Sequence, residues 1–227
     1  MQPQDVLADP KDAFLSAMRF RRAIKAFDPD RRIAAADFDF LLEVARLSPS
    51  SNGLEPWNIL VIESPQLREK LHSEALIPQA QLQASHLIAF TAKTAKVLAR
   101  DSSHFRHMNV DVRGYPAADA EQRFAGFQSF LADKLGIGDN NRAIFDYAAR
   151  QAYIAMANLC TAAAFIGVES CPLEGFVYAA AEKALAEAGV LELSTDRLAV
   201  MVALGYRSED PHREQVRREM GEIVRFS

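Results

Sequence analysis

The chain has 227 residues, of which 49% are apolar and 25% charged, and its net charge is −4 at neutral pH. This composition is ordinary for a globular protein and excludes a disordered or fibrous chain. The negative charge has the wrong sign for a general binder of nucleic acids or anionic membranes, so we expect neither partner. The length fits a single domain over residues 1–227.

Two cysteines, Cys160 and Cys171, are too few for a disulfide framework or a thiolate-rich metal site. The first residues lack the basic head and apolar run of a secretory signal, and the longest apolar stretch, 152–168, is too short to span a membrane. We therefore expect a soluble, cytoplasmic protein.

The first hundred residues predict three helices and two buried strands. Asp9-Pro10 is a typical helix start, and apolar residues then recur at helical spacing. A segment rich in small and turn-forming residues, 49–57, follows the second helix. The predicted helices cover 11–22, 35–47 and a stretch beginning at 65, and the predicted strands cover 58–62 and 86–91.

The second half predicts a helical excursion or lid over 101–135, because 101–118 have no clean period and 120–135 carry an apolar helical face. A long helix over 141–166 ends at Gly167, where the left-handed conformation is usual. An extended turn over 168–176, a helix over 177–188 and a strand over 198–204 follow. The charged tail from 206 to 227 forms a C-terminal arm. Helices dominate over a few strands, which indicates an α+β or α/β sandwich.

Three short segments carry candidate binding chemistry. Arg19, Arg21, Arg22 and Lys25 could hold a phosphate through charge-assisted hydrogen bonds, or could simply be a solvated helix end. Segment 49–53 could bind the edge of a planar polar ligand, or merely connect a helix to a strand. Segment 172–176 places a Glu-Gly pair in an apolar turn, which could expose backbone N–H groups or be an ordinary turn.

Other signals point to no chemistry. The Gly136-x-Gly138 pair lacks a third glycine and a preceding strand, so it is not a dinucleotide fingerprint. His104 and His107 are the one close histidine pair, and no carboxylate lies between them. We expect no metal site and no serine or cysteine nucleophile.

The segments taken together resemble the nitroreductase family of FMN-dependent, NAD(P)H-using oxidoreductases. The resemblance lies in family order and covers nearly the whole chain. Its motifs are Arg21 to Phe27, Ser48 to Trp57, Ala84-Ser85-His86, Gln151-Ala152-Tyr153 and Pro172 to Phe176. The chain departs from the family at Ala23, where a serine is usual, at Gly53 and Glu55, and near Ile77, where the family has a ring-contacting Asn. Gln79 or Gln81 could take over that contact.

The resemblance implies a three-layer sandwich, with a central, mostly antiparallel sheet flanked by helices and a C-terminal arm exchanged in a homodimer. It implies FMN at the dimer interface, with segment 50–52 reaching the flavin from the facing subunit. The phosphate would meet Arg21, Arg22 and Arg217, and Lys25 would lie near the ring. The implied cofactor-binding residues are Arg21, Arg22, Ala23, Lys25, Pro49, Ser50, Ser51, Asn52, Gly53, Gln151, Pro172, Leu173, Glu174, Gly175 and Arg217.

The activity implied by the resemblance is ping-pong transfer of a hydride from NAD(P)H through FMN to an electron-poor small molecule, such as a nitroaromatic or a quinone. No side chain is required as a dedicated acid or base. Phe124, Phe127 or Phe130 would shape the acceptor pocket. A dedicated flavin or pteridine reductase, a reductive dehalogenase of the same family and a non-catalytic flavin-binding protein remain alternatives. The physiological acceptor and the choice between NADH and NADPH leave no motif in the sequence.

Overall fold

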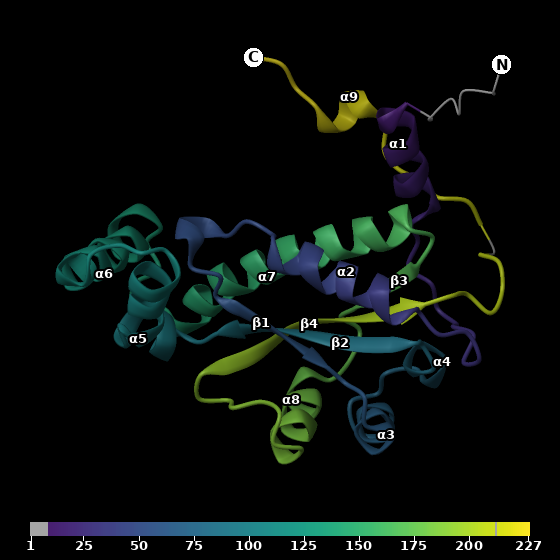
Figure 1. The fold of residues 1–227 in the computed structure, drawn as a ribbon, viewed down its shortest axis with the longest axis horizontal. Coiled ribbons are helices and arrows are strands. Elements are labelled where there is room, and N and C mark those ends of the chain that lie inside the picture. Colours follow the sequence, from purple (N-terminus) through teal and green to yellow (C-terminus); the bar gives the residue numbers. More distant parts are fainter. Residues whose placement is uncertain (1–8, 212) are drawn as a thin grey trace.

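The computed structural model describes residues 9–211 and 213–227, and its centre is a four-stranded sheet (Figure 1). The strands are β1 (Trp57–Val61), β2 (His86–Lys93), β3 (Glu169–Leu173) and β4 (Asp196–Gly205). Their order across the sheet is β1-β2-β4-β3, and every neighbouring pair is antiparallel. The central strands β2 and β4 are buried on both faces, which explains their nearly continuous apolar sequences.

Helices cover both faces of the sheet, so the predicted α+β three-layer sandwich is confirmed (Figure 1). One layer contains α2 (Ala35–Arg46) and α7 (Asn141–Phe165), and the other contains α3 (Pro65–Ser73), α4 (Gln79–Leu82) and α8 (Tyr178–Glu187). Two apolar clusters fill the spaces between these layers and the sheet. Helix α7 contacts all four strands. Its many buried alanines allow this close approach.

The segment 168–176, which the sequence pattern suggested to be an extended turn, contains a true edge strand. Strand β3 pairs with β4 from Glu169–Gly205 to Leu173–Met201. Pro172 lies within it, and an edge strand tolerates a proline whose missing N–H faces away from the neighbouring strand. The extended turn was therefore wrong for 169–173 and right for the residues that follow.

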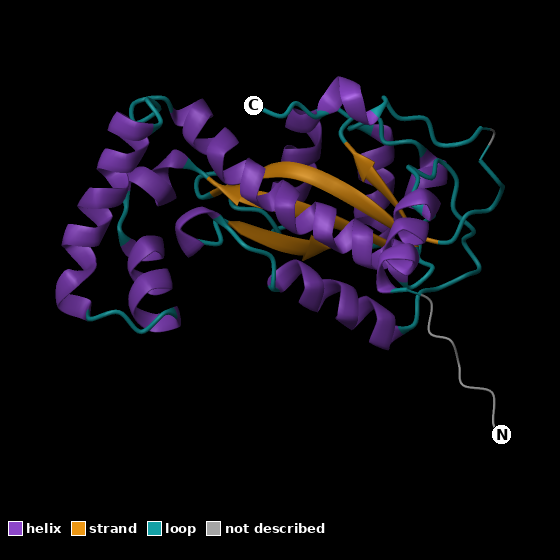
Figure 2. Ribbon diagram, turned by 90° about the horizontal axis from the view of Figure 1, so that it is seen from above, coloured by secondary structure: helices purple, strands orange, loops and turns teal. Residues whose placement is uncertain are grey.

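The excursion extends beyond the end of the sheet (Figure 2). It contains short helical pieces followed by α6 (Ala120–Ser129), and its core is a stack of Phe105, Phe124 and Phe127. The short pieces are η2 (Lys96–Arg100), α5 (Ser103–Arg106), η3 (His107–Val112), η4 (Ala117–Asp119) and η5 (Phe130–Lys134). Segment η3, which lies within 101–118, is a wide π-type turn, and this explains why that stretch shows no clean period of 3.6 residues.

The two ends of the described chain lie on the same side of the molecule (Figure 1). Helix α1 (Pro10–Phe20) begins at the predicted Asp9 cap, whose carboxylate accepts the N–H of Lys11. The tail from residue 206 returns past α1 and ends in α9 (Met220–Ile223). Among the described residues, no helix is both long and apolar enough to cross a membrane.

Candidate cofactor site

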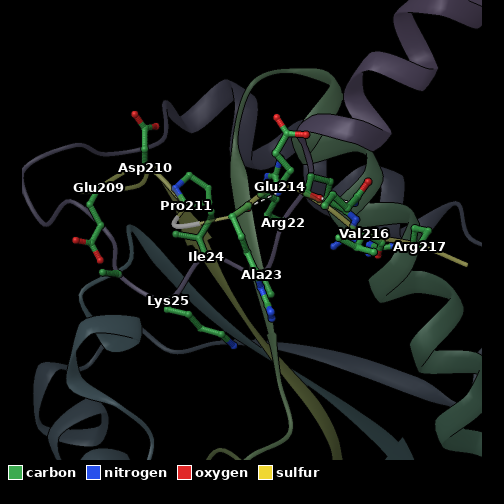
Figure 3. A pocket seen from close by; sticks show the side chains of 14 residues that line it. Arg22, Ala23, Ile24, Lys25, Glu209, Asp210, Pro211, Glu214, Val216 and Arg217 are labelled. Atoms are coloured by element: carbon green, nitrogen blue, oxygen red, sulfur yellow. Dashed lines mark hydrogen bonds between the residues drawn. The ribbon is translucent and has the colours of Figure 1, made fainter.

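A basic cavity of about 580 Å³ lies between the segment after α1 and the C-terminal tail (Figure 3). Arg21, Arg22 and Lys25 line it from the first segment, and Arg217 lines it from the tail. Four of the residues predicted from the sequence therefore share one cavity, although Arg217 lies nearly 200 positions after the other three. Ala23 lines it too, and its methyl group supplies no hydrogen-bond donor.

The cations of this cavity are largely uncommitted within the chain. Across residues 9–211 and 213–227, neither Arg21, Lys25 nor Arg217 forms an ion pair. Arg22 donates to the backbone carbonyl of Arg213 at 3.0 Å. Such guanidinium groups around an open space are the geometry that binds a phosphate dianion.

The tail contributes acidic residues that sequence reasoning did not anticipate. Glu209, Asp210 and Glu214 also line the basic cavity. Figure 3 shows the carboxylates of Asp210 and Glu214 pointing away from Lys25. The resemblance placed only Arg217 of the tail beside Arg21 and Arg22, so the fold was needed to reveal these acidic neighbours.

A second, smaller cavity of about 320 Å³ adjoins the first and shares Lys25 with it. Pro172, Leu173, Glu174 and Gly175 line its other wall. A Cβ atom placed on Gly175 would meet nothing within 4 Å. The backbone at this turn is therefore accessible to a ligand, as the sequence prediction required.

Gln81 is the residue that stands near Lys25 where the family's Asn was expected. It lines the small cavity together with Ile77, whereas Gln79 does not. Its side chain is buried, and its amide nitrogen contacts the thiol of Cys171 at 3.8 Å, a weak partner. The Lys25 ammonium lies 3.8 Å from the same sulfur. Burial raises the pKa of Cys171, so its thiol stays protonated at neutral pH.

Glu174 has a partner that the sequence did not assign. The hydroxyl of Tyr153, from α7, donates a hydrogen bond to the Glu174 carboxylate. Burial and this hydrogen bond raise the pKa of Tyr153 well above its ordinary value, so the phenol remains a donor. The spacing Gln151-x-Tyr153 was the available signal, and the structure shows that Tyr153 reaches the turn while Gln151 does not.

The remaining predicted residues form a separate group. Pro49, Ser50, Ser51, Asn52 and Gly53 lie on the loop between α2 and β1, which includes the short helix η1 (Ser51–Gly53). Gln151 is buried beneath this loop, where its Oε1 accepts the N–H of Ser51 at 2.9 Å and its Nε2 donates to the carbonyl of Tyr147 at 3.0 Å. None of these six residues lines either cavity of this single chain.

The predicted acceptor-pocket aromatics are placed unequally. Phe124 and Phe127 are buried in the stack inside the excursion, and Phe130 is half-buried and packs edge-on against Tyr147.

Among the described residues, no group of three His, Cys, Asp or Glu side chains could hold a metal ion. His104 and His107 point to different partners, the Leu54 carbonyl and the Asp111 carboxylate.

Comparison with known proteins defines the class. The model of the nitroreductase family matches residues 18–206, and the chain therefore belongs to this family. It is 40% identical over 97% of its length to a Bacillus subtilis protein named "Putative NAD(P)H nitroreductase YfkO", all of which is covered. It is 38% identical to a Staphylococcus epidermidis protein named "Putative NAD(P)H nitroreductase SERP2086", with 92% of this chain and 94% of the relative aligned.

Solved structures with the same fold include a Bacillus subtilis nitroreductase, ydfN, with a TM-score of 0.77, 19% identity, and coverage of 96% of this chain and 100% of that one. A nitroreductase from Exiguobacterium sibiricum was solved in complex with FMN and aligns with a TM-score of 0.72 and 21% identity. That alignment covers 97% of this chain and 98% of the other. The predicted family and fold are confirmed.

Proposed function

We propose that this chain is an FMN-dependent NAD(P)H oxidoreductase that reduces electron-poor small molecules such as nitroaromatics and quinones. The observation that carries the proposal is the position of Lys25, which is shared by a cavity lined with arginines and a cavity lined by the open Glu174-Gly175 turn. The two cavities together suit a ligand with a phosphate at one end and a planar ring at the other. The names of the two relatives, which both include NAD(P)H, support the nicotinamide donor.

The residues present fit FMN. Arg21, Arg22 and Arg217 would hold the phosphate, because each guanidinium offers several donors to anionic oxygens. Lys25 would lie beside the ring, where a cation stabilises the negative charge that accompanies reduction. The backbone N–H of Gly175 would donate to a ring nitrogen, and Pro172 and Leu173 would cover one face of the ring.

When bound, FMN would accept a hydride from NAD(P)H and pass it to the acceptor. The chain itself would orient the ring and leave one face open for both substrates in turn. No side chain in either cavity is needed as an acid or a base, since water can supply the proton. Sequential use of one face predicts parallel double-reciprocal lines, and intersecting lines would contradict it.

We further propose an obligate homodimer in which the partner's Ser50, Ser51 and Asn52 complete the cofactor site. This would explain why these residues lie away from both cavities of a single chain. Large apolar side chains also remain exposed on α1, α7 and the tail; these are Phe14, Leu15, Ile154, Phe165, Val216, Met220 and Phe226. A monomer gains nothing by exposing such a surface. The arm formed by 206–227 would pack on the partner.

The decisive experiment is to purify the protein, record its visible spectrum before and after adding FMN, and add NADH and NADPH separately without air. We expect a bound flavin whose absorbance near 450 nm disappears when at least one of the two donors is added. The absorbance should return when a nitroaromatic or a quinone is added. A protein that stays colourless with excess FMN would refute the proposal. A flavin that no donor reduces would leave only a flavin-binding role. Light scattering that finds a flavin-loaded monomer would refute the dimer.

A further inference from the structure

The loop of residues 49–55, here called the serine loop, has an unusual backbone. Asn52, Gly53 and Glu55 have φ angles of 57°, 60° and 42°. These values lie in the left-handed region, which residues with a Cβ atom rarely adopt. Such a conformation persists only where the surrounding structure holds it in place. The contacts around the serine loop should therefore identify what holds it.

On one side, α7 holds the serine loop. Gln151 accepts the N–H of Ser51 at 2.9 Å, and the Asn52 amide donates to the hydroxyl of Tyr147 at 3.3 Å. Within the serine loop, the Ser50 hydroxyl accepts the N–H of Glu55 at 2.8 Å. These contacts fix both ends of the loop and leave the carbonyls of Asn52 and Leu54 for another partner.

On the other side, the excursion supplies that partner. The guanidinium of Arg113 donates to the carbonyl of Asn52 at 2.8 Å, and the ring Nε2 of His104 donates to the carbonyl of Leu54 at 2.8 Å. The Arg113 guanidinium is also packed closely on Gly53, since a Cβ there would lie 3.3 Å from its atoms. The first carbonyl belongs to a left-handed residue, Asn52, and the second immediately precedes another, Glu55.

We propose that Arg113 is a positioning residue for cofactor binding. It holds Asn52 and Gly53 in the conformation that presents the serine loop to FMN, and it thereby makes the excursion a support for the cofactor. The proposal rests on the proposed function. The Arg113 guanidinium is engaged with the carbonyl of Asn52 at 2.8 Å, so it acts through the loop.

Arg123 provides a matched control. Both Arg113 and Arg123 belong to the excursion and lie over the ring of Tyr115, at 5.0 and 3.9 Å from its centre. Only Arg113 contacts the serine loop. Replacing either arginine removes a charge and a cation–π contact to Tyr115. Only the replacement of Arg113 also removes the hydrogen bond to the serine loop.

The test is titration of the cofactor-free protein with FMN, followed by flavin fluorescence, for the parent and for Arg113→Ala, Arg113→Lys and Arg123→Ala. We expect Arg113→Ala to raise the dissociation constant about tenfold, as the loss of one charge-assisted hydrogen bond predicts. Arg113→Lys keeps a donor for the Asn52 carbonyl and should restore most of the affinity. Arg123→Ala should bind FMN like the parent, and thermal melting should give all four proteins the same midpoint within a few degrees.

Equal dissociation constants for Arg113→Ala and Arg123→Ala, whether both unchanged or both raised, would overturn the positioning role and leave the proposed function intact. A lower melting midpoint for Arg113→Ala, large enough to account for the lost binding, would also overturn it. A parent protein that binds no FMN would refute the proposed function itself, which distinguishes the two failures.

Discussion

Arg207 holds the buried carboxylate of Glu169 with both its side chain and its backbone N–H. The N–H lies 2.6 Å from Oε2, and the guanidinium pairs with Oε1. Glu169 starts β3, and Arg207 follows β4, at the point where the tail leaves the sheet. This pair therefore fixes the direction in which the tail runs toward the basic cavity.

We predict that Arg207→Met destabilises the protein by about 3 kcal/mol, because it leaves the Glu169 carboxylate buried without its cation. Urea denaturation at neutral pH measures the loss. Asp210→Asn is the control, since Asp210 contacts the same guanidinium at 3.3 Å but its side chain is 96% exposed. That variant should stay within about 0.5 kcal/mol of the parent. Equal unfolding midpoints for the two variants would contradict the prediction.

Arg21→Ala should weaken FMN binding. An uncompensated phosphate charge costs about 1.5–3 kcal/mol, which corresponds to a rise in the dissociation constant of about 10- to 150-fold. Arg19→Ala is the matched control, because Arg19 is exposed on α1 and lines neither cavity. Equilibrium dialysis against FMN compares the two. Equal flavin retention would remove Arg21 from the phosphate site.

Arg217 can be tested against its neighbour in the same way. Arg217 lines the basic cavity and Arg218 does not. Arg217→Ala should raise the FMN dissociation constant at least tenfold, the lower end of what one charge-assisted hydrogen bond supplies. Arg218→Ala should leave the dissociation constant unchanged, because Arg218 does not line the cavity. The two variants have the same net charge, so they differ only in which contact is lost. If both variants lose affinity equally, a diffuse electrostatic effect of the tail would replace the specific contact.

Gln81→Leu should reduce FMN affinity about fivefold, the value of one neutral hydrogen bond. The stability of the cofactor-free protein should not change. The amide is buried beside a thiol and has only this weak partner for its nitrogen. A leucine of similar size therefore loses little in the folded state. Gln79→Leu serves as the control, since Gln79 lines neither cavity. A large loss of thermal stability in Gln81→Leu, with FMN affinity retained, would assign the amide a structural role only.

Stability should fall as the pH drops below about 6.5, the ordinary pKa of histidine. Burial lowers the pKa of His104, and burial together with the nearby Arg32 and Arg68 lowers that of His86. In that range the unfolded chain binds protons that the folded chain does not, so acid favours unfolding. Urea midpoints at pH 7.5, 6.5 and 5.5 measure the slope. His86→Gln should flatten it, and the exposed His107→Gln should not.

The sequence by itself determined most of the local structure and the family. The apolar periods placed the ends of α1, α2, α7 and α8 within about two residues but missed the short helices α4 and α9, and the Asp9 cap and the Gly167 stop lie where the pattern indicated. The arginines at 21 and 22 and the Glu174-Gly175 turn, which line the two cavities, were also readable, because they lie in short contiguous motifs. The pattern failed at β3, whose strand character comes from pairing with β4, and it resolved no separate elements within 101–118, where the π-type turn η3 disrupts the helical period.

Only the tertiary structure decided which distant residues share a space. It placed Glu214 of the tail in the cavity that Arg21 lines, placed Gln81 rather than Gln79 beside Lys25, and turned Gln151 into a support for Ser51. The same holds for Tyr153 on Glu174 and for Arg113 on Asn52. The physical reason is that these contacts depend on how helices and loops pack across the sheet, and packing between segments far apart in the chain leaves no periodic trace in either segment.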